Sequence, residues 1–331
     1  MRFDITSAAM NGLEPTLDDL DAILGRAEIG IHLLDIADPD ALLASSWYES
    51  CRPNRCKVLQ EFVRVSAYRG VGTKGPHRRR IPVTDAASAR RARALAYSVF
   101  RVLLENADSD GRLLKLALHV FATPATLALC YGHGAACTPK AVEIESRGGI
   151  GELKKLLEDR LEEAATAGLE ARIVVVHDSD AEWLGDAKPA PAAVAAVSAA
   201  NGVPCPPLTK RMAENFVPDS VWSAWAADRK NTANRAMVTA LLSLTPGQRD
   251  FVKFDKSTTP PWNNGKVQVS TLYAGVTVPV YDELTRSSLK RLAESALEFA
   301  LNGSLPSPAE ISIRDANADL ERIVRTIEDG L

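Results

Sequence analysis

A short apolar run that ends in two aspartates constrains the fold of this chain more than any other segment. Residues 173–180 read IVVVHDSD. Four successive β-branched residues are typical of a strand that is buried on both faces, as at the centre of a parallel sheet. Asp178 and Asp180 follow, and a spacing of two in an extended chain points both carboxylates to the same side. Aspartate and serine are also common in turns and at helix N-termini, so this pair alone is a weak signal of a site.

Two more strands are expected upstream, and the first of them also ends in an acid. Residues 100–104 form an apolar run that is followed by Glu105 and by a polar turn into a helix. Residues 141–146 (AVEIES) predict another strand, after which come a glycine turn and an amphipathic helix with Leu153, Leu156, Leu157 and Leu161 on one face. This alternation predicts an α/β fold with a mostly parallel sheet flanked by helices. Ligands of such sheets bind at the carboxyl ends of the strands, where Glu105 and the acidic pair lie.

This order of features resembles a Toprim domain, the compact α/β metal-binding fold of bacterial primases, topoisomerases and OLD-like nucleases. The resemblance spans roughly residues 98–220. In that family a glutamate ends the first strand, glycines follow the second, and a D-x-D motif ends the third. The matching positions in this chain are Glu105, Gly148 with Gly149, and Asp178 with Asp180.

A later segment strengthens the resemblance and is similar to a narrower group within the family. Stand-alone Toprim-like proteins of bacterial defence loci carry a K/R-x-x-E-N-aromatic element, which is similar to the segment that contains Lys210, Arg211, Glu214, Asn215 and Phe216. The sequence LTPGQRDFVKFDKS, with Lys253, is similar to the tail of that group. The resemblance implies a Mg²⁺-dependent or Mn²⁺-dependent nuclease, plausible as the effector of an antiviral defence system.

The chain departs from the family pattern in the loop after Glu105. Asn106 stands where the family has glycine, and the next acid is either Asp108 or Asp110 in a turn that is one residue longer. The second acidic ligand from this loop is therefore left open between the two. Residues 125–131 predict an extra edge strand between the first helix and the glycine turn.

The chemistry of the carboxylates points to a hard cation. Three carboxylates at one sheet edge raise one another's pKa unless a counter-charge is present. All-oxygen ligation favours Mg²⁺ or Mn²⁺ over zinc, and such an ion suits phosphodiester hydrolysis. We expect Glu105, Asp178 and Asp180 to be its ligands. Glu214 and the second loop acid, Asp110 or Asp108, are candidates for binding a second ion.

Basic residues are expected to contact the phosphates of a nucleic acid. Lys210, Arg211 or Lys253 could offset negative charge in the transition state, with Lys253 assigned by the resemblance alone. A loop at residues 68–80 carries the densest positive charge in the chain, at Arg69, Lys74, Arg78, Arg79 and Arg80. A solvated surface hairpin is an equally good interpretation of that loop.

Three regions are predicted: residues 1–95, 96–220 and 221–331. The first is an α+β region with a helix at 17–27 and strands at 28–36 and 57–70. The second is the Toprim-like domain, and the third is mainly helical, with Trp222, Trp225 and Trp262 packing it. His177 is expected to be a buried, hydrogen-bonded histidine rather than a general base.

Composition restricts the function classes further. The formal net charge of −3 argues against a protein that coats nucleic acid by bulk charge. Without a run of 18 apolar residues, and with acids near the start of the sequence, the chain is expected to be cytoplasmic and without a membrane span. Five cysteines at irregular spacing predict reduced thiols.

Partners and alternative functions stay open at this stage. A P-loop motif is absent from the sequence, so any ATPase or sensor that works with a nuclease of this type would be a separate chain. The chain could form an oligomer. The alternatives to a nuclease are a binding or scaffold protein that holds a metal without catalysis, and a phosphodiesterase that acts on a small nucleotide.

Overall fold

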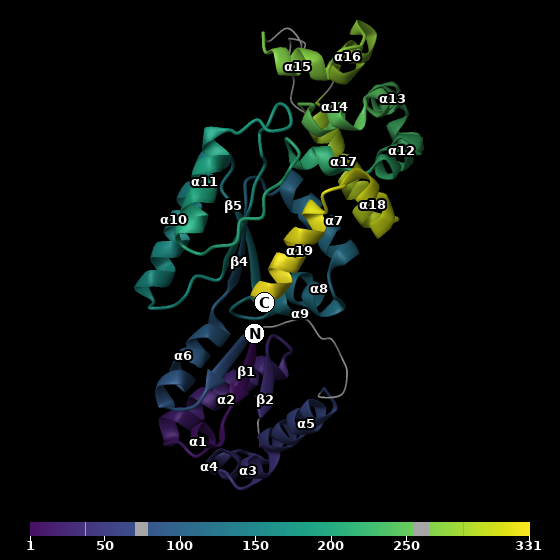
Figure 1. The fold of residues 1–331 in the computed structure, drawn as a ribbon. Coiled ribbons are helices and arrows are strands. Elements are labelled where there is room, and N and C mark those ends of the chain that lie inside the picture. Colours follow the sequence, from purple (N-terminus) through teal and green to yellow (C-terminus); the bar gives the residue numbers. More distant parts are fainter. Residues whose placement is uncertain (37, 70–78, 254–264, 287) are drawn as a thin grey trace.

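The chain folds around two small parallel sheets, one in the N-terminal region and one in the middle of the sequence (Figure 1). The computed structural model describes residues 1–36, 38–69, 79–253, 265–286 and 288–331. Helices flank both sheets, which confirms the predicted α/β class. The C-terminal helices lie beside the second sheet and beyond its carboxyl edge. None of the helices in the described ranges is both long and apolar enough to cross a bilayer.

The N-terminal sheet contains β1 (Arg2–Ile5), β2 (Leu33–Ile36) and β3 (Arg80–Val83) in the order β2-β1-β3, with all strands parallel. Its helices are α1 (Ser7–Met10), α2 (Glu14–Glu28), α3 (Pro39–Leu43), α4 (Ser46–Ser50), α5 (Pro53–Arg69) and α6 (Ala86–Tyr97). The apolar side chains of this region form a core of their own, in which Phe3, Ile5 and Trp47 are fully buried.

The strand predicted at 57–70 is wrong, because the structure has helix α5 there. The apolar residues that meet the N-terminal core are Val58, Leu59, Phe62 and Val63. This spacing repeats every three to four residues, as one face of a helix requires, and does not alternate as a half-buried strand would. The first residues of the predicted basic loop, Tyr68 and Arg69, therefore belong to α5, and its residues 70–78, including Lys74 and Arg78, lie outside the described residues.

The second sheet confirms the three strands predicted for the Toprim-like region. They are β4 (Phe100–Leu104), β5 (Val142–Ser146) and β6 (Ile173–Val176), in the parallel order β5-β4-β6. The two faces of the sheet are covered differently, because strand residues alternate between them. Leu103 and Val175 pack towards α10 (Ile150–Thr166) and α11 (Pro189–Ala200), whereas Leu104 and Val176 belong to a second core on the opposite face.

The opposite face is covered by α7 (Ser109–Phe121), α8 (Pro124–Tyr131) and the C-terminal helix α19 (Asp319–Gly330) (Figure 1). The strand predicted at 125–131 is wrong, since α8 occupies that segment. The helix begins in the usual way: the Thr123 hydroxyl accepts a hydrogen bond from the Thr126 N–H at 3.3 Å, and Pro124 takes the first helical position. A short helix, α9 (His133–Ala136), then leads into β5.

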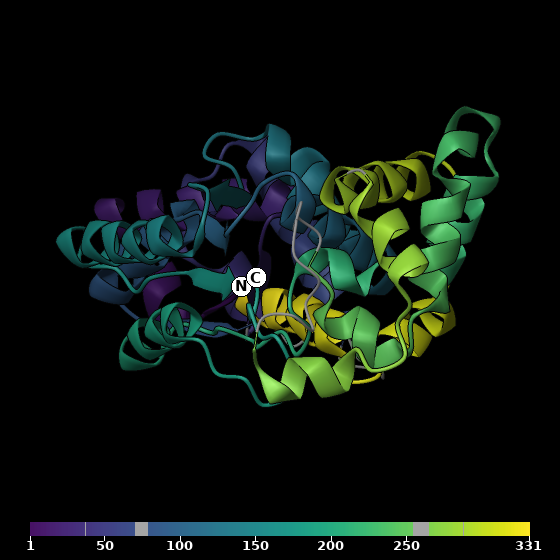
Figure 2. The same cartoon turned by 90° about the horizontal axis from the view of Figure 1, so that it is seen from above.

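The C-terminal region is helical, as predicted, and shares its core with the second sheet. Trp222 and Trp225 are buried in this core, and Trp262 lies outside the described residues. Seen from above, these helices lie together at one side of the molecule (Figure 2). They are η1 (Ala213–Phe216), α12 (Asp219–Ala227), η2 (Arg229–Asn234), α13 (Arg235–Ser243), α14 (Pro246–Phe251), α15 (Val267–Leu272), α16 (Val278–Thr285), α17 (Leu289–Asn302) and α18 (Pro308–Arg314).

The common core leads to a first expectation about stability. Leu297 of α17 is fully buried in the core that this helix shares with the second sheet. Leu297→Ala should lower the free energy of unfolding by about 2–5 kcal/mol, because it leaves a cavity in that core. Denaturant unfolding measures the effect, and Arg291→Ala, at an exposed position of the same helix, is the control. A loss below about 1 kcal/mol for Leu297→Ala would contradict the packing described here.

Candidate active site

The register of two neighbouring strands brings two of the predicted acids together. Leu104 of β4 pairs with Val176 of β6, so Glu105 follows directly beside His177 and Asp178. The chain then leaves the two strands in opposite directions, because α7 follows β4 on one face and α11 follows β6 on the other. Between such diverging loops lies the topological switch point of an open parallel sheet, the usual position of a ligand site.

Asp178 is buried and held by the segment that follows the sheet. Its side chain accepts a hydrogen bond at 2.7 Å from the backbone N–H of Ala213, the first residue of η1. Burial raises the pKa of Asp178 well above its usual value, and repulsion from Asp110, Glu214 and Glu105 adds to this effect. The same hydrogen bond therefore brings Glu214, the next residue of η1, to the acids at the ends of β4 and β6.

Glu105 lies among the same carboxylates. Burial raises its pKa to about 7, with further contributions from the negative charges of Asp110 and Asp180. Its Oε2 atom is buried and has no hydrogen-bond partner among the residues that the structure describes. The positive charge of Lys290 and the backbone N–H of Asp178 act in the opposite direction, and an additional cation would stabilise the ionised form of Glu105 further.

The structure distinguishes between the two loop acids that the sequence left open. Asp110, in the first turn of α7, is buried, and its carboxylate accepts hydrogen bonds from the Asn106 N–H at 2.9 Å and the Ser109 hydroxyl at 3.1 Å. Burial raises the pKa of Asp110. The Asp108 side chain is instead 75% exposed and lies 3.5 Å from Arg112. Asp110 is therefore the loop acid that joins the cluster.

Glu214 completes a group of buried acids and comes with a cation that the sequence did not indicate. Only 1% of its side chain is exposed, and burial raises its pKa. Within the described parts of the chain, neither of its carboxylate oxygens has a hydrogen-bond partner. Lys290, the second residue of α17, places its Nζ atom 3.7 Å from Glu214 Oε1. We call Glu105, Asp110, Asp178 and Glu214 the acid cluster.

Asp180 sits differently from what the D-x-D spacing suggested. Strand β6 ends at Val176, and Asp180 has a φ of +54°, so the alternation of an extended chain does not apply to the pair. Its backbone N–H donates to the Arg211 carbonyl at 3.0 Å, which fixes the loop, and its half-buried carboxylate repels that of Glu105. Asp180 therefore lies at the rim of the acid cluster.

His177 is buried, and its Nδ1 atom lies 2.7 Å from the Asp178 carbonyl oxygen. This confirms the predicted buried, hydrogen-bonded histidine. Burial lowers the pKa of the imidazole, so the neutral ring is favoured.

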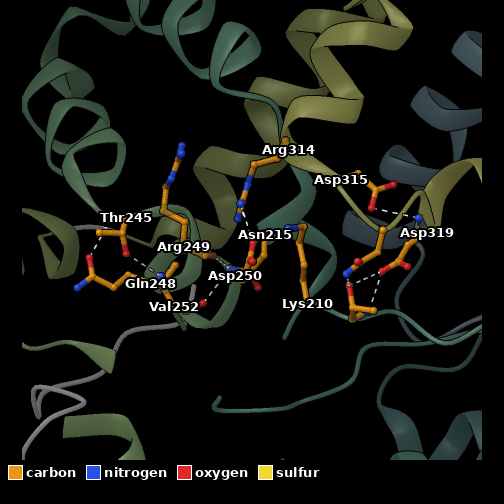
Figure 3. A network of polar contacts seen from close by, with 12 residues as sticks. Lys210, Asn215, Thr245, Gln248, Arg249, Asp250, Val252, Arg314, Asp315 and Asp319 are labelled. Atoms are coloured by element: carbon orange, nitrogen blue, oxygen red, sulfur yellow. Dashed lines mark hydrogen bonds and ion pairs between the residues drawn. The ribbon is translucent and has the colours of Figure 1, made fainter. Parts of the chain in front are cut away.

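The predicted phosphate-facing cations near the sheet bond to other residues of the chain, as Figure 3 shows for Lys210. The Lys210 ammonium pairs with Asp250 and lies 5.3 Å from the centre of the Phe216 ring, and Arg314 contacts the same aspartate at 2.6 Å. The Arg211 guanidinium donates to the Phe251 carbonyl at 3.3 Å. Lys210 and Arg211 therefore link the segment that carries Glu214 to α14. Lys253 is exposed and precedes the undescribed residues 254–264.

The predicted nucleic-acid loop is only partly described, at its end. Arg79 pairs with Glu170 at 2.6 Å, and Arg80 pairs with Asp4 at 2.7 Å, so both arginines make ion pairs within the chain. Arg69 is the last residue of α5. The remaining residues of the loop stay a prediction.

The oxygen ligands of the acid cluster are of the type that hard cations prefer. Its ligand atoms are carboxylate oxygens, and three of them are buried without a hydrogen-bond partner in the described chain. The positive charge of Lys290 balances only part of the negative charge of these acids. Within the described ranges, however, no three histidine, cysteine, aspartate or glutamate side chains are already arranged around a common ion position. Binding of an ion would therefore require the carboxylates to turn towards it.

The chain was compared with protein-family models, with curated proteins and with solved structures, and no match was found in any of the three comparisons.

The raised pKa of Glu105 sets the sign of a pH effect. Below its ordinary pKa of 4.5 the group is protonated in both the folded and the unfolded chain, and between that value and about 7 only the folded chain keeps the proton. Stability of the metal-free protein should therefore fall as the pH rises from about 5 to about 8. Thermal unfolding in the presence of EDTA measures this dependence.

Two variants test the assignment of that pH effect to Glu105. Glu105→Gln keeps the shape without the charge, so its melting temperature should fall less than that of the wild type over the same pH range. Asp108→Asn removes an exposed acid of the same loop and should leave the wild-type dependence unchanged. An equal pH dependence in Glu105→Gln and the wild type would show that Glu105 is not the group responsible.

Proposed function

We propose that this chain is a divalent-cation-dependent nuclease of the Toprim type, which hydrolyses phosphodiester bonds of a nucleic acid. The observation that supports this most is the buried acid cluster at the switch point of the parallel sheet, where acids from β4, α7, β6 and η1 meet. Structural ion pairs seldom bury several carboxylates beside a single lysine. Sites for metal-dependent phosphoryl chemistry do gather several carboxylates, because the metal ion supplies the positive charge.

Mg²⁺ or Mn²⁺ is the proposed cofactor. Glu105 and Asp178 would hold it, with Asp180 at the rim, and Asp110 and Glu214 could hold a second ion. When bound, such an ion polarises a phosphoryl oxygen and makes a water molecule more acidic.

The protein groups around the ligands have positioning roles. Asn106 and Ser109 orient Asp110 through their hydrogen bonds, and Ala213 orients Asp178. The Asn215 side chain fixes η1 by donating to the Arg249 and Val252 carbonyls at 2.7 and 3.1 Å (Figure 3). Glu105, with a pKa near 7 in the metal-free protein, can hold or release a proton at neutral pH.

Substrate and partners remain part of the proposal. The nucleic acid would reach the cluster at the carboxyl edge of the second sheet, with Arg211 as a candidate for phosphate contact. The basic segment 68–80 would contact a more distant part of the nucleic acid, because Arg79 lies with Glu170 and Phe100 at the opposite, amino-terminal edge of that sheet. The resemblance to defence proteins supports a cytoplasmic antiviral effector that works with a separate ATPase or sensor chain.

A metal-holding scaffold without catalysis is the second candidate. Lys290 favours it, because a lysine that already neutralises part of the acid cluster is compatible with a purely structural role. A phosphodiesterase for a small nucleotide would use the same chemistry as the nuclease.

Cleavage assays test the proposal directly. The wild type should cut plasmid DNA, single-stranded DNA or transfer RNA when Mg²⁺ or Mn²⁺ is present, and EDTA should stop the reaction. The double variant Asp178→Ala, Asp180→Ala should lower the rate by about 100-fold or more, since it removes carboxylates that hold the ion.

Asp108→Asn serves as the matched control, because it removes a nearby acid outside the acid cluster, and its rate should stay within about twofold of the wild type. Equal cutting by the wild type and the double variant would indicate a contaminating nuclease. A wild-type protein that binds Mn²⁺ in calorimetry but cuts none of the polynucleotides would favour the scaffold. Hydrolysis of a nucleotide without polynucleotide cleavage would favour the phosphodiesterase.

A further inference from the structure

Lys290 is a cation that approaches the acid cluster. Its Nζ atom lies 3.7 Å from Glu214 Oε1, and its positive charge also lowers the pKa values of Glu105 and Asp110. Glu214 lies in η1, Glu105 directly follows β4 and Asp110 lies in α7, whereas Lys290 comes from α17 in the C-terminal region. The lysine is therefore a counter-charge that another part of the chain supplies.

The packing of α17 holds the backbone of Lys290 in place. Leu289 and Ala293 on either side are buried, and Ser295 accepts a hydrogen bond from the Trp225 indole at 3.2 Å. The Lys290 side chain itself is 32% exposed. The side chain therefore lies between the acid cluster and solvent.

The contact between Lys290 and Glu214 is loose. A separation of 3.7 Å is an ion pair without a hydrogen bond, and both Glu214 oxygens lack hydrogen-bond partners among the described residues. Glu214 is 99% buried, and among the described residues its own backbone N–H, Lys290 and the Ser109 hydroxyl lower its pKa, so only part of its ligand capacity is unused. The unused capacity of Glu214 indicates a position for a cation other than Lys290. This argument depends on the state of Glu214 alone and not on how many acids lie nearby.

We propose that the Lys290 ammonium occupies the cation position beside Glu214 and Asp110, so that a divalent ion binds there only by displacing it. The inference rests on the proposed metal-dependent function and deepens it. Lys290 would set the affinity of this half of the acid cluster for divalent ions.

Removal of the charge should tighten ion binding. We expect Lys290→Met to lower the Kd for Mn²⁺ by about tenfold, because a competing charge within a few ångströms is lost. Isothermal calorimetry with Mn²⁺ at neutral pH and constant ionic strength measures the Kd. Lys290→Gln should show the same change, and it replaces Lys290→Met if that variant does not fold. Lys290→Arg, which keeps the charge, should bind like the wild type.

Arg291→Met is the matched control for charge at a distance. It removes one positive charge from the neighbouring, exposed position of α17, and its Kd should stay within about twofold of the wild type. As a second readout, Mn²⁺ should raise the melting temperature of Lys290→Met more than that of the wild type.

The outcomes separate this inference from the proposed function. If the neutral variants bind Mn²⁺ no more tightly than the wild type while metal-dependent cleavage persists, the displacement of Lys290 is wrong and the nuclease stands. If neither the wild type nor the neutral variants bind Mn²⁺, both proposals fall. If Arg291→Met tightens binding as much as Lys290→Met, the effect is general electrostatics and the specific role of Lys290 is wrong.

Discussion

The parallel pairing of β4 with β6 is the constraint on which the site depends. Because Leu104 lies opposite Val176, the residues that follow each strand emerge side by side, and Glu105 meets Asp178 without a long loop to position either. The side chains that hold this register are the buried residues of the two strands, which pack on helices at both faces. A slip of one residue would move Glu105 away and turn these apolar side chains to the wrong faces of the sheet.

The site is then shaped by the cost of burying negative charge. An isolated ionised carboxylate in a protein interior costs several kcal/mol, so the acids at this edge are stable only when protonated, hydrogen-bonded or neutralised by a cation. The structure contains part of each solution: backbone N–H groups bond Asp110 and Asp178, the pKa of Glu105 is raised, and Lys290 approaches Glu214. The described residues compensate this negative charge only in part. The site therefore favours an additional positive charge, and the proposed function uses this property.

The sequence predicted the parts of this arrangement that have a local signature. The β-branched run before Asp178 and the apolar run before Glu105 identified two strands, and their acids were placed at the correct edge. The segments 57–70 and 125–131 were wrongly predicted as strands, since short apolar runs fit either structure until packing selects a helix. Lys290 could not be predicted, because nothing around it in the sequence differs from an ordinary surface helix. The packing of α17 against α7 and η1 brings it to the acids.

Direct location of a bound ion tests the central claim most sharply. Crystals grown with Mn²⁺ and measured for anomalous scattering should show a peak within about 2.5 Å of oxygen atoms of both Glu105 and Asp178, since divalent ions of this class bind carboxylates at such distances. A peak there, with the carboxylates turned towards it, would establish the acid cluster as a cation site. Fully ordered carboxylates with no peak between them at saturating Mn²⁺ would contradict the account.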